Sequence, residues 1–325
     1  MSIEKKPLVN DLYTADPSAH VFNGKIYIYP SHDEDIDVEN NDNGDQYDMK
    51  DYHVYEMPDT ETYPRDCGCV LKLEDIPWAS KQLWAPDCVE KDGKYYFVYP
   101  ARDKEGFFRI GIAIGDKPEG PFKPEPNYIP GSYSIDPCMF PDTDGKYYLT
   151  FGGIWGGQLD QYRNNKWSAD NKEPKGDEEA CTAKIALMKD NLLEMAEEPK
   201  DIVIVDENGK PLTGGDEARR YFEDPWMFKK GDTYYFTYST GTTHLLCYAT
   251  SKNVYGPYTY GGVILTPVLG WTTHHSILEF NGKWYLFYHD CERSGGVNQK
   301  RNVKFRELKF NDDGSIQTMD GSLDK

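Results

Sequence analysis

The sequence predicts an all-β protein, a five-bladed β-propeller, and three observations lead to this prediction. A phrase typical of a β-hairpin recurs five times along the 325 residues. Each copy places a short turn with glycine between two runs of β-forming residues. The copies start about 50–90 residues apart, which is enough chain for one four-stranded blade each. Because a β-sandwich has no fivefold internal repeat, we predict one propeller domain over residues 1–325.

Each element of the propeller follows from this phrase. The five copies, whose first strands should line the central axis, are residues 16–29, 85–99, 136–151, 223–238 and 274–288. Runs of β-forming residues predict further strands at residues 109–115, 246–251 and 302–310. Two of these stretches lead into matching Gly-Pro-aromatic endings at residues 120–122 and 256–258, which indicates that they are equivalent outer strands. Two insertions are expected at residues 156–180 and 199–222, and one short helix at residues 187–198.

The composition limits the classes of function. The chain carries 36 basic and 55 acidic residues, a net charge of −19, and 38% of its residues are hydrophobic. Aromatic residues make up 14%, and since each can bury about 150–250 Å², they can supply the core of a polar chain. The negative charge argues against a nucleic-acid partner and favours a neutral or cationic substrate.

The same composition bears on location and on the cysteines. The chain contains no run of about 18 apolar residues, so we expect no membrane span. Residues 1–10 contain no apolar signal-peptide core, so we expect a cytoplasmic protein. The chain has seven cysteines and no Cys-x-x-Cys pair that would indicate a zinc site. Cys67 and Cys69 are too close for a common disulfide, and we expect buried thiols.

Three of the five copies begin with a carboxylate: Asp16, Asp136 and Glu223. In a propeller these side chains would converge at one mouth of the central channel, where they would repel one another and lose hydration. Most acidic residues are solvated surface groups, but three at the same repeat position indicate a functional site. Such a group can hydrolyse a glycosidic bond. One acid protonates the leaving oxygen, another activates water or attacks the sugar, and a third raises the pKa of the acid.

These motifs resemble those of glycoside hydrolase family 43 over about residues 11–316. They are Ala-Asp-Pro-Ser at 15–18, Ser-Ile-Asp-Pro at 134–137 and Phe-Glu-Asp-Pro at 222–225. The resemblance implies a five-bladed, inverting enzyme in which Asp16 is the general base, Asp136 the pKa modulator and Glu223 the general acid. Inversion places the carboxyl groups of base and acid about 6.5–9.5 Å apart. In the family Gly-Pro often follows the acid, whereas Asp-Pro follows it here.

The resemblance also implies roles for four further residues. His274, in a His-x-Ser pattern, would face a calcium ion in the channel, or else it fills the channel as a hydrogen-bond donor. Trp84 and Trp155 would stack on a sugar, or else belong to the core. Arg301 would face the substrate, or else lie on the surface. The acidic segment 33–51 does not fit the register of an EF-hand, so we expect a loop near the pocket mouth.

Together these features predict an exo-acting, inverting glycoside hydrolase that releases xylose, arabinose or both from small oligosaccharides. It would need no organic cofactor, and its oligomeric state stays open. An arabinan- or arabinoxylan-debranching arabinofuranohydrolase is the alternative within the class. A non-catalytic sugar-binding propeller is the alternative from another class. Such a protein could have lost any of the three acids, whereas all three are present here, which disfavours it. A retaining, fructan-cleaving propeller is disfavoured because Ala15 stands before Asp16, where such an enzyme would have asparagine.

Overall fold

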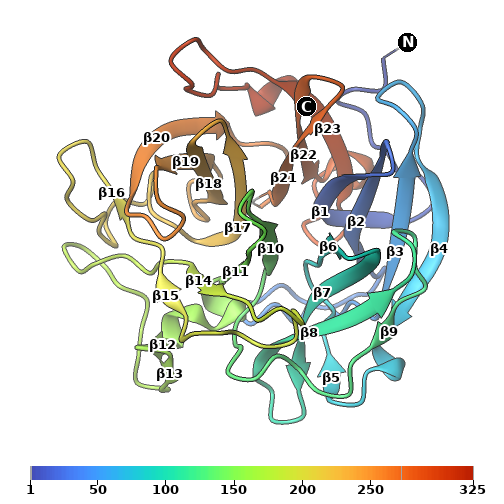
Figure 1. Cartoon of the computed structure of the whole chain (residues 1–325), viewed down its shortest axis with the longest axis horizontal. Coiled ribbons are helices and arrows are strands. Elements are labelled where there is room, and N and C mark those ends of the chain that lie inside the picture. Colours follow the sequence, from blue (N-terminus) through green and yellow to red (C-terminus); the bar gives the residue numbers. More distant parts are fainter. Residues whose placement is uncertain (1, 272, 325) are drawn as a thin grey trace.

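Five sheets, the blades, are arranged around a common centre (Figure 1). The computed structural model describes residues 2–271 and 273–324 of the chain. In this part it contains strands and short 3-10 turns, and no α-helix. The prediction of an all-β, five-bladed propeller is therefore confirmed.

The first two blades take up the N-terminal third of the chain. The first consists of β1 (Tyr13–Phe22), β2 (Lys25–Asp33), β3 (Asp51–Met57) and β4 (Arg65–Lys72). The second consists of β6 (Asp87–Lys91), β7 (Lys94–Asp103), β8 (Phe108–Gly115) and β9 (Lys123–Pro124), with β5 (Ala79–Lys81) paired to β7.

The other three blades follow in chain order. The third consists of β10 (Cys138–Pro141), β11 (Tyr147–Phe151), β14 (Lys184–Leu187) and β15 (Lys200–Asp201); a separate hairpin of β12 (Tyr162–Arg163) and β13 (Lys166–Trp167) precedes β14. The fourth consists of β17 (Glu223–Lys230), β18 (Thr233–Ser239), β19 (Leu246–Ser251) and β20 (Tyr258–Leu265), with β16 (Ile204–Val205) parallel to β20. The fifth consists of β21 (His275–Phe280), β22 (Lys283–Asp290) and β23 (Asn302–Leu308).

Each of the five repeats forms the inner hairpin of one blade, as predicted. In the first blade Phe22 pairs with Lys25 across a two-residue turn. Both turn residues lie in the left-handed region, Asn23 at φ 52° and Gly24 at φ 75°. This turn matches the twist of the flanking strands, which is why Asn-Gly is common in tight hairpins. The strands expected at 109–115, 246–251 and 302–310 are β8, β19 and β23.

The helix predicted at residues 187–198 is wrong. The chain turns back on itself there, and Met188 pairs with Met195. The Asn191 side chain accepts a hydrogen bond from the Leu193 amide, and Leu192 lies at φ 57°. Asparagine side chains compete with the helix for backbone donors in this way, so a polar turn replaces a helix.

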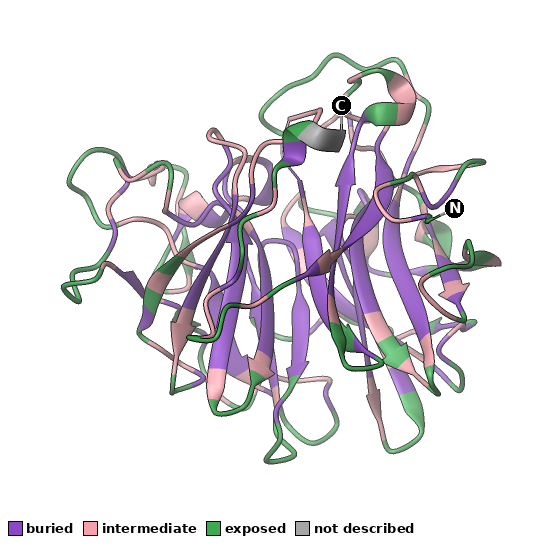
Figure 2. Cartoon of the chain, turned by 90° about the horizontal axis from the view of Figure 1, so that it is seen from above, coloured by how far each residue is buried: buried purple, intermediate pink, exposed green. Residues whose placement is uncertain are grey.

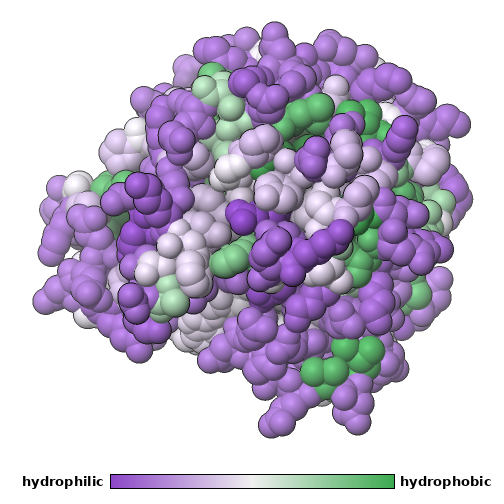
Figure 3. All heavy atoms as spheres, turned by 90° about the horizontal axis from the view of Figure 1, so that it is seen from below, coloured by the Kyte–Doolittle hydropathy of each residue, from purple (hydrophilic) through white to green (hydrophobic). Residues whose placement is uncertain are grey.

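Aromatic side chains supply much of the core, as the composition predicts. Tyr29, Tyr52, Tyr99 and Tyr238 are among the largest fully buried side chains. Figure 2 shows that the strands are mostly buried and that the connecting loops are exposed. Figure 3 shows one side of the molecule, where hydrophilic residues predominate and hydrophobic ones form small, separate groups. The polar composition of the chain is therefore concentrated in its loops and surface.

The N-terminal segment completes the fifth blade, which has only three strands of its own. The Lys5 amide donates to the Phe305 carbonyl (3.0 Å), and the Leu8 amide donates to the Val303 carbonyl (2.9 Å). The start of the chain thus lies along β23, next to the blade that β1 begins. This pairing joins the two ends of the ring and fixes the position of β1.

Two expectations about the chain as a whole can be compared with the structure. Among the described residues no helix is long and apolar enough to cross a membrane. The thiols of Cys88, Cys138, Cys247 and Cys291 are buried, as expected. Cys69 is exposed, so the expectation of buried thiols is wrong for the outer strand of the first blade.

Candidate active site

Three aspartates at the starts of repeats share an unusual backbone conformation. Asp16 (φ 50°), Asp136 (φ 56°) and Asp224 (φ 64°) each precede a proline and lie in the left-handed region. A bulge follows Ala15 in the first blade and Glu223 in the fourth, so these two residues are equivalent. Our interpretation that Glu223 shares the repeat position of the other two acids is therefore wrong, because Asp224 holds it. Non-glycine residues at such angles cost about 1–3 kcal/mol each and cluster at functional sites.

A pocket of about 250 Å³ opens where the repeat starts meet. Asp16, Asp136 and Glu223 all line it, so the structure brings together three acids that are far apart in sequence. The segment 34–50 contributes several polar residues to the lining, so the acidic segment 33–51 forms a loop at the pocket, as the sequence predicts. The cavity lies below the range of about 300–1,000 Å³ that is usual for drug-sized ligands, so it suits a small molecule.

Asp16 is held as an ion. Its carboxylate accepts hydrogen bonds from the Ser31 hydroxyl and from Arg301 Nη1 (3.0 Å). Burial alone would raise the pKa of Asp16, but Arg301, His274, His289 and Ser31 outweigh burial and lower the pKa to about 2. Burial lowers the pKa of His274 to about 4, so this imidazole is neutral near pH 7. Arg301 is therefore the permanent positive charge that keeps Asp16 ionised.

Glu223 and Asp136 are shifted in the opposite direction. Burial and the charge of Asp16 raise the pKa of Glu223 to about 8, although Arg301 opposes the shift. Burial, Glu223 and Asp16 raise the pKa of Asp136 well above its usual range. The Asp136 carboxylate accepts one hydrogen bond, from the Asp224 amide (3.1 Å). Both shifts favour the protonated form, in contrast to Asp16.

The opposed shifts separate two carboxyl groups into a base and an acid. An ionised Asp16 can take a proton from water, and a protonated Glu223 can give one to a leaving oxygen. Environments that push the pKa values of two neighbouring acids apart mark such a pair of roles. A pair of this kind in a small pocket is the arrangement that glycoside hydrolysis needs.

Two neighbouring histidines, His274 and His275, contact Asp224. His274 Nε2 lies 2.7 Å from Asp224 Oδ1, and His274 Nδ1 lies 3.6 Å from Asp16 Oδ1. His275 donates its backbone amide to Asp224 Oδ2 (2.8 Å), and its ring contacts the same oxygen. The other ring nitrogen of His275 contacts the Thr237 hydroxyl (2.6 Å). His274 thus links the base to Asp224, while His275 is fixed inside the fold.

Trp84 has one edge in the core and lines the pocket with the rest of its ring. Its Nε1 donates to the Tyr47 carbonyl (2.8 Å), and its ring lies 4.6 Å from that of Phe108. A Cβ atom on Gly44 would come within 2.5 Å of Trp84 Cη2, and one on Gly156 within 3.1 Å. Two glycines therefore let the backbone of neighbouring loops close on the indole and set its angle.

Trp155 also lines the pocket, from the loop that follows β11. Its Nε1 donates to Glu173 (2.9 Å), and its ring lies 5.0 Å from Phe222 and 5.8 Å from Trp271. Its backbone lies at φ 57°, in the Gly-rich segment 152–157. Each tryptophan is therefore partly buried and lines the pocket, and stacking on a sugar stays a prediction for both.

Arg301 is 9% exposed, so the alternative of a surface arginine is wrong. Its guanidinium donates to both oxygens of Asp33 (2.8 and 2.7 Å) and to Asp16 (3.0 Å). It lies 4.8 Å from the centre of the Tyr47 ring. Arg301 lines the pocket, as expected of a residue that faces the substrate. Its guanidinium hydrogen bonds go to Asp33 and Asp16, so its role in this structure is to hold the base in its ionised form.

Several site residues escaped the sequence analysis. Asp224 could have been found, because Asp-Pro at 224–225 repeats the motif at 16–17 and 136–137. Asp33 and His289 lie at the ends of β2 and β22, and no local pattern there marks them. Trp271 and Tyr47 come from loops whose path only the fold decides.

Comparison with known proteins agrees with this geometry. The family model Glycosyl hydrolases family 43 matches residues 5–316. A xylosidase/arabinosidase of Bacteroides ovatus is 57% identical over 99% of both chains. A xylosidase/arabinosidase of Humicola insolens is 58% identical over 96% of this chain and 98% of its own.

Solved structures give the same result. A β-xylosidase with 57% identity superposes with a TM-score of 0.96 over 98% of both chains. A β-xylosidase/α-arabinofuranosidase from a compost metagenome, in complex with xylotriose and in a calcium-free form, has 55% identity, and its TM-score is also 0.96 over 99% of this chain and 98% of its own. The match of fold, motifs and sequence over nearly the whole length leads to one conclusion: the chain belongs to glycosyl hydrolases family 43 and is a glycoside hydrolase.

Proposed function

We propose that this enzyme removes single xylose or arabinose units from the ends of small xylo- or arabino-oligosaccharides, with inversion at the anomeric carbon. The observation that carries this proposal is the pairing of an ionised Asp16 with a protonated Glu223 in one small pocket. The names of the similar enzymes support the sugars, and a similar enzyme of Xanthomonas citri, 50% identical, is known in complex with xylose.

In the proposed reaction Asp16 takes a proton from a water molecule, which attacks the anomeric carbon. Glu223 gives its proton to the oxygen that joins the sugar to the rest of the substrate. Asp136 acts as the modulator of the acid: whenever it is ionised, its negative charge favours the protonated form of Glu223. The indoles of Trp84 and Trp155 face the apolar side of the sugar rings. For inversion the reacting carboxyl groups lie about 6.5–9.5 Å apart, and this distance stays a prediction.

The loops around the pocket favour attack at a chain end. Segment 34–50 contributes Asn40, Asn41 and Asp42 to the lining. Its Asn43 carbonyl and the Gly156 carbonyl accept hydrogen bonds from the same Arg102 guanidinium, so this segment and the loop of Trp155 meet and close one side of the pocket. A pocket enclosed in this way admits the end of a chain, while a polymer bound in its middle needs a groove open on both sides. This enclosure supports exo-action on oligosaccharides over action on a polysaccharide.

The pocket can also hold a divalent cation. Asp224 Oδ1 is buried and, besides His274 Nε2 at 2.7 Å, no described group satisfies it. An imidazole nitrogen and a carboxylate oxygen at this spacing can ligate one ion, so the residues present fit a calcium ion with water as its other ligands. We propose that His274 and Asp224 would hold Ca²⁺, whose charge would further favour the ionised base. Alternatively, His274 only donates a hydrogen bond to Asp224. Enzyme treated with a chelator should regain activity when Ca²⁺ is added, and His274→Ala should not.

Hydrolysis of p-nitrophenyl β-xyloside and α-arabinofuranoside by wild type and Glu223→Ala tests the reaction. We expect both substrates to be cleaved by wild type, and the variant to be slower by about 10²–10⁴-fold on xylo-oligosaccharides, the usual contribution of a general acid. Equal rates would overturn the assignment of the acid. Proton NMR of the first-formed sugar distinguishes inversion from retention. With xylohexaose as substrate, xylose and xylopentaose as the only first products indicate exo-action, whereas early xylobiose, xylotriose and xylotetraose indicate endo-action.

The debranching activity is the second outcome of the same assay. Arabinoxylan arabinofuranohydrolases of Bacillus subtilis and Paenibacillus polymyxa are 28% and 25% identical, well below the xylosidases. Release of arabinose from intact arabinoxylan, with slow cleavage of xylotriose, would favour that alternative. A cytoplasmic location stays a proposal, tested by assaying the activity in separated cell fractions of the source organism.

A further inference from the structure

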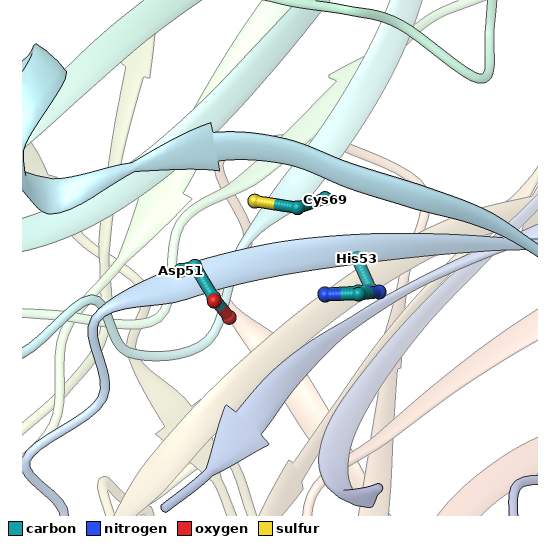
Figure 4. A group of neighbouring side chains, drawn as sticks. All are labelled: Asp51, His53 and Cys69. Carbon is teal, nitrogen blue, oxygen red and sulfur yellow. The ribbon is translucent and has the colours of Figure 1, made fainter. Parts of the chain in front are cut away.

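A cluster of metal-ligating side chains lies on the outer strands of the first blade. Asp51, His53 and Cys69 each offer one ligand atom, and these three atoms lie within 4.8 Å of one another. None of the three residues lines the catalytic pocket. Figure 4 shows Asp51 and His53 on β3 and Cys69 on the adjacent β4. The cluster is thus separate from the acids of the active site.

The strand register explains why these side chains meet. Asp51 and His53 are two residues apart on β3, and alternate residues of a strand point to the same face. His53 pairs directly with Cys69 across the two strands. Register shifts on both sides of His53 bend the ladder at this point, and bulges of this kind redirect side chains.

Neighbouring groups hold two of the ligands in place. His53 Nδ1 lies 3.0 Å from Asp66 Oδ2, which leaves Nε2 for a metal. His32 Nδ1 lies 2.6 Å from Asp51 Oδ1. Histidines that bind metals in proteins nearly always donate their second ring nitrogen to a carboxylate or carbonyl. The contact of His53 with Asp66 is of this type, and it fixes both tautomer and ring orientation.

Burial and access also suit a metal. The side chains of His53 and Asp51 are 17% and 25% exposed, so they are largely shielded from water. Cys69 is exposed and provides the path of entry. Among the described residues its Sγ donates one weak hydrogen bond, to the Leu71 carbonyl at 3.9 Å, which a metal can readily replace.

We propose that Asp51, His53 and Cys69 form a site for Zn²⁺ with water as the fourth ligand. A thiolate and an imidazole select zinc over calcium, which prefers oxygen ligands. Metal–ligand distances of about 2.0–2.3 Å place tetrahedral ligands about 3.3–3.8 Å apart, so the three atoms would draw together by about 1 Å through side-chain rotation. On binding, the Cys69 thiol loses its proton to solvent and the sulfur forms a bond to the metal.

Such a metal would join β3 to β4 and would also fix one end of the pocket loop. β2 ends at Asp33, directly after His32, and β3 begins at Asp51. The contact of His32 with Asp51 therefore closes the loop 34–50, which lines the catalytic pocket. The proposed site is thus placed to stabilise the first blade and this loop together.

Titration of the chelator-treated, tag-free enzyme with Co²⁺ tests the proposal, because a cobalt–thiolate bond absorbs strongly in the near ultraviolet. The described lining of the catalytic pocket contains no cysteine, so a metal bound there gives no such band. We expect one band in wild type and in the matched control Cys67→Ser, and none in Cys69→Ser. A wild type without the band, or a band that persists in Cys69→Ser, would overturn the site.

Thermal unfolding gives a second readout that does not depend on activity. At a Zn²⁺ concentration of about 100 times its dissociation constant, we expect the melting temperature of wild type to rise by about 5 °C. Cys69→Ser should lose this shift, and His53→Gln should need at least about tenfold more Zn²⁺ to reach it. Equal shifts in wild type and Cys69→Ser would contradict the proposal even if the Co²⁺ band were present. Both variants should cleave xylosides when Ca²⁺ is present and Zn²⁺ is absent, which verifies that they fold.

Discussion

Replacement of Glu223 by glutamine, Glu223→Gln, should remove the alkaline limb of the pH profile. With its pKa raised to about 8 by burial and by the charge of Asp16, Glu223 is about nine-tenths protonated at pH 7 and about one-tenth at pH 9. If this proton is the one given to the leaving group, kcat/KM for xylobiose should fall about tenfold between these two pH values. Glutamine has nearly the same shape and does not titrate, so the variant should be slow and should show no such fall.

The assay is the pH dependence of kcat/KM from pH 5 to pH 10, for xylobiose and for a xyloside with a good leaving group. Wild type should lose activity above pH 8 on both substrates, and more on xylobiose, because a good leaving group needs less protonation. The variant should be about 10²–10⁴-fold slower on xylobiose, which corresponds to about 3–5 kcal/mol of transition-state stabilisation. On the activated substrate the loss should be smaller.

A control separates the loss of the proton donor from the loss of a negative charge. Glu279 is an exposed glutamate on β21, and Glu279→Gln should keep both the rate and the alkaline limb of wild type. An alkaline limb of wild-type position in Glu223→Gln would show that another group titrates, and it would refute the assignment of the acid.

Three further outcomes follow from the structure. The raised pKa means that folded Glu223 binds more protons than unfolded Glu223 between about pH 4.5 and 8, so the contribution of Glu223 to stability falls as pH rises through this window. Glu223→Gln should therefore raise the melting temperature by about 5 °C at pH 7, and by less at pH 5. Arg301→Gln removes the permanent positive charge beside Asp16, so the pKa of the base should rise and the acidic limb of kcat/KM should move to higher pH. The free energy of unfolding should fall by about 3–5 kcal/mol, because buried carboxylates lose their partner. An unchanged acidic limb would contradict the role of this charge. Gly44→Ala places a methyl group within 2.5 Å of Trp84, so KM for xylo-oligosaccharides should rise. The control is Gly24→Ala: Gly24 has a similar φ, but open space surrounds its Cβ position, so this variant should change only stability. Equal KM values in these two variants would exclude the contact with Trp84 as the cause.

The repeat phrase was sufficient to predict the five inner hairpins. Its turn residues and alternating β-formers act within about 15 residues, so no distant contact is needed to read them. The helix predicted at 187–198 failed for a related reason. The apolar residues there suggested a helix, but the side chain of Asn191 satisfies a backbone donor locally and turns the chain.

The site was predicted in its residues and misjudged in its register. Asp16, Asp136 and Glu223 all line the pocket, yet Asp224 and not Glu223 is the repeat equivalent of the first two. The printed sequence contains this signal in its Asp-Pro pairs. Glu223 precedes that position by one residue, and successive residues of a strand point to opposite faces. This offset gives the proposed acid a place distinct from that of the base.

The sequence by itself determined the number of blades, the strand pairs and the acids at their starts, because these depend on turns and alternation that neighbouring residues fix. Only the tertiary structure decided which acid carries a proton. The ionised state of Asp16 depends on Arg301, 285 residues away along the chain, and the protonated state of Glu223 depends on burial and on the charge of Asp16. A pKa reports the surroundings of a group in space, and the closed ring of blades creates those surroundings.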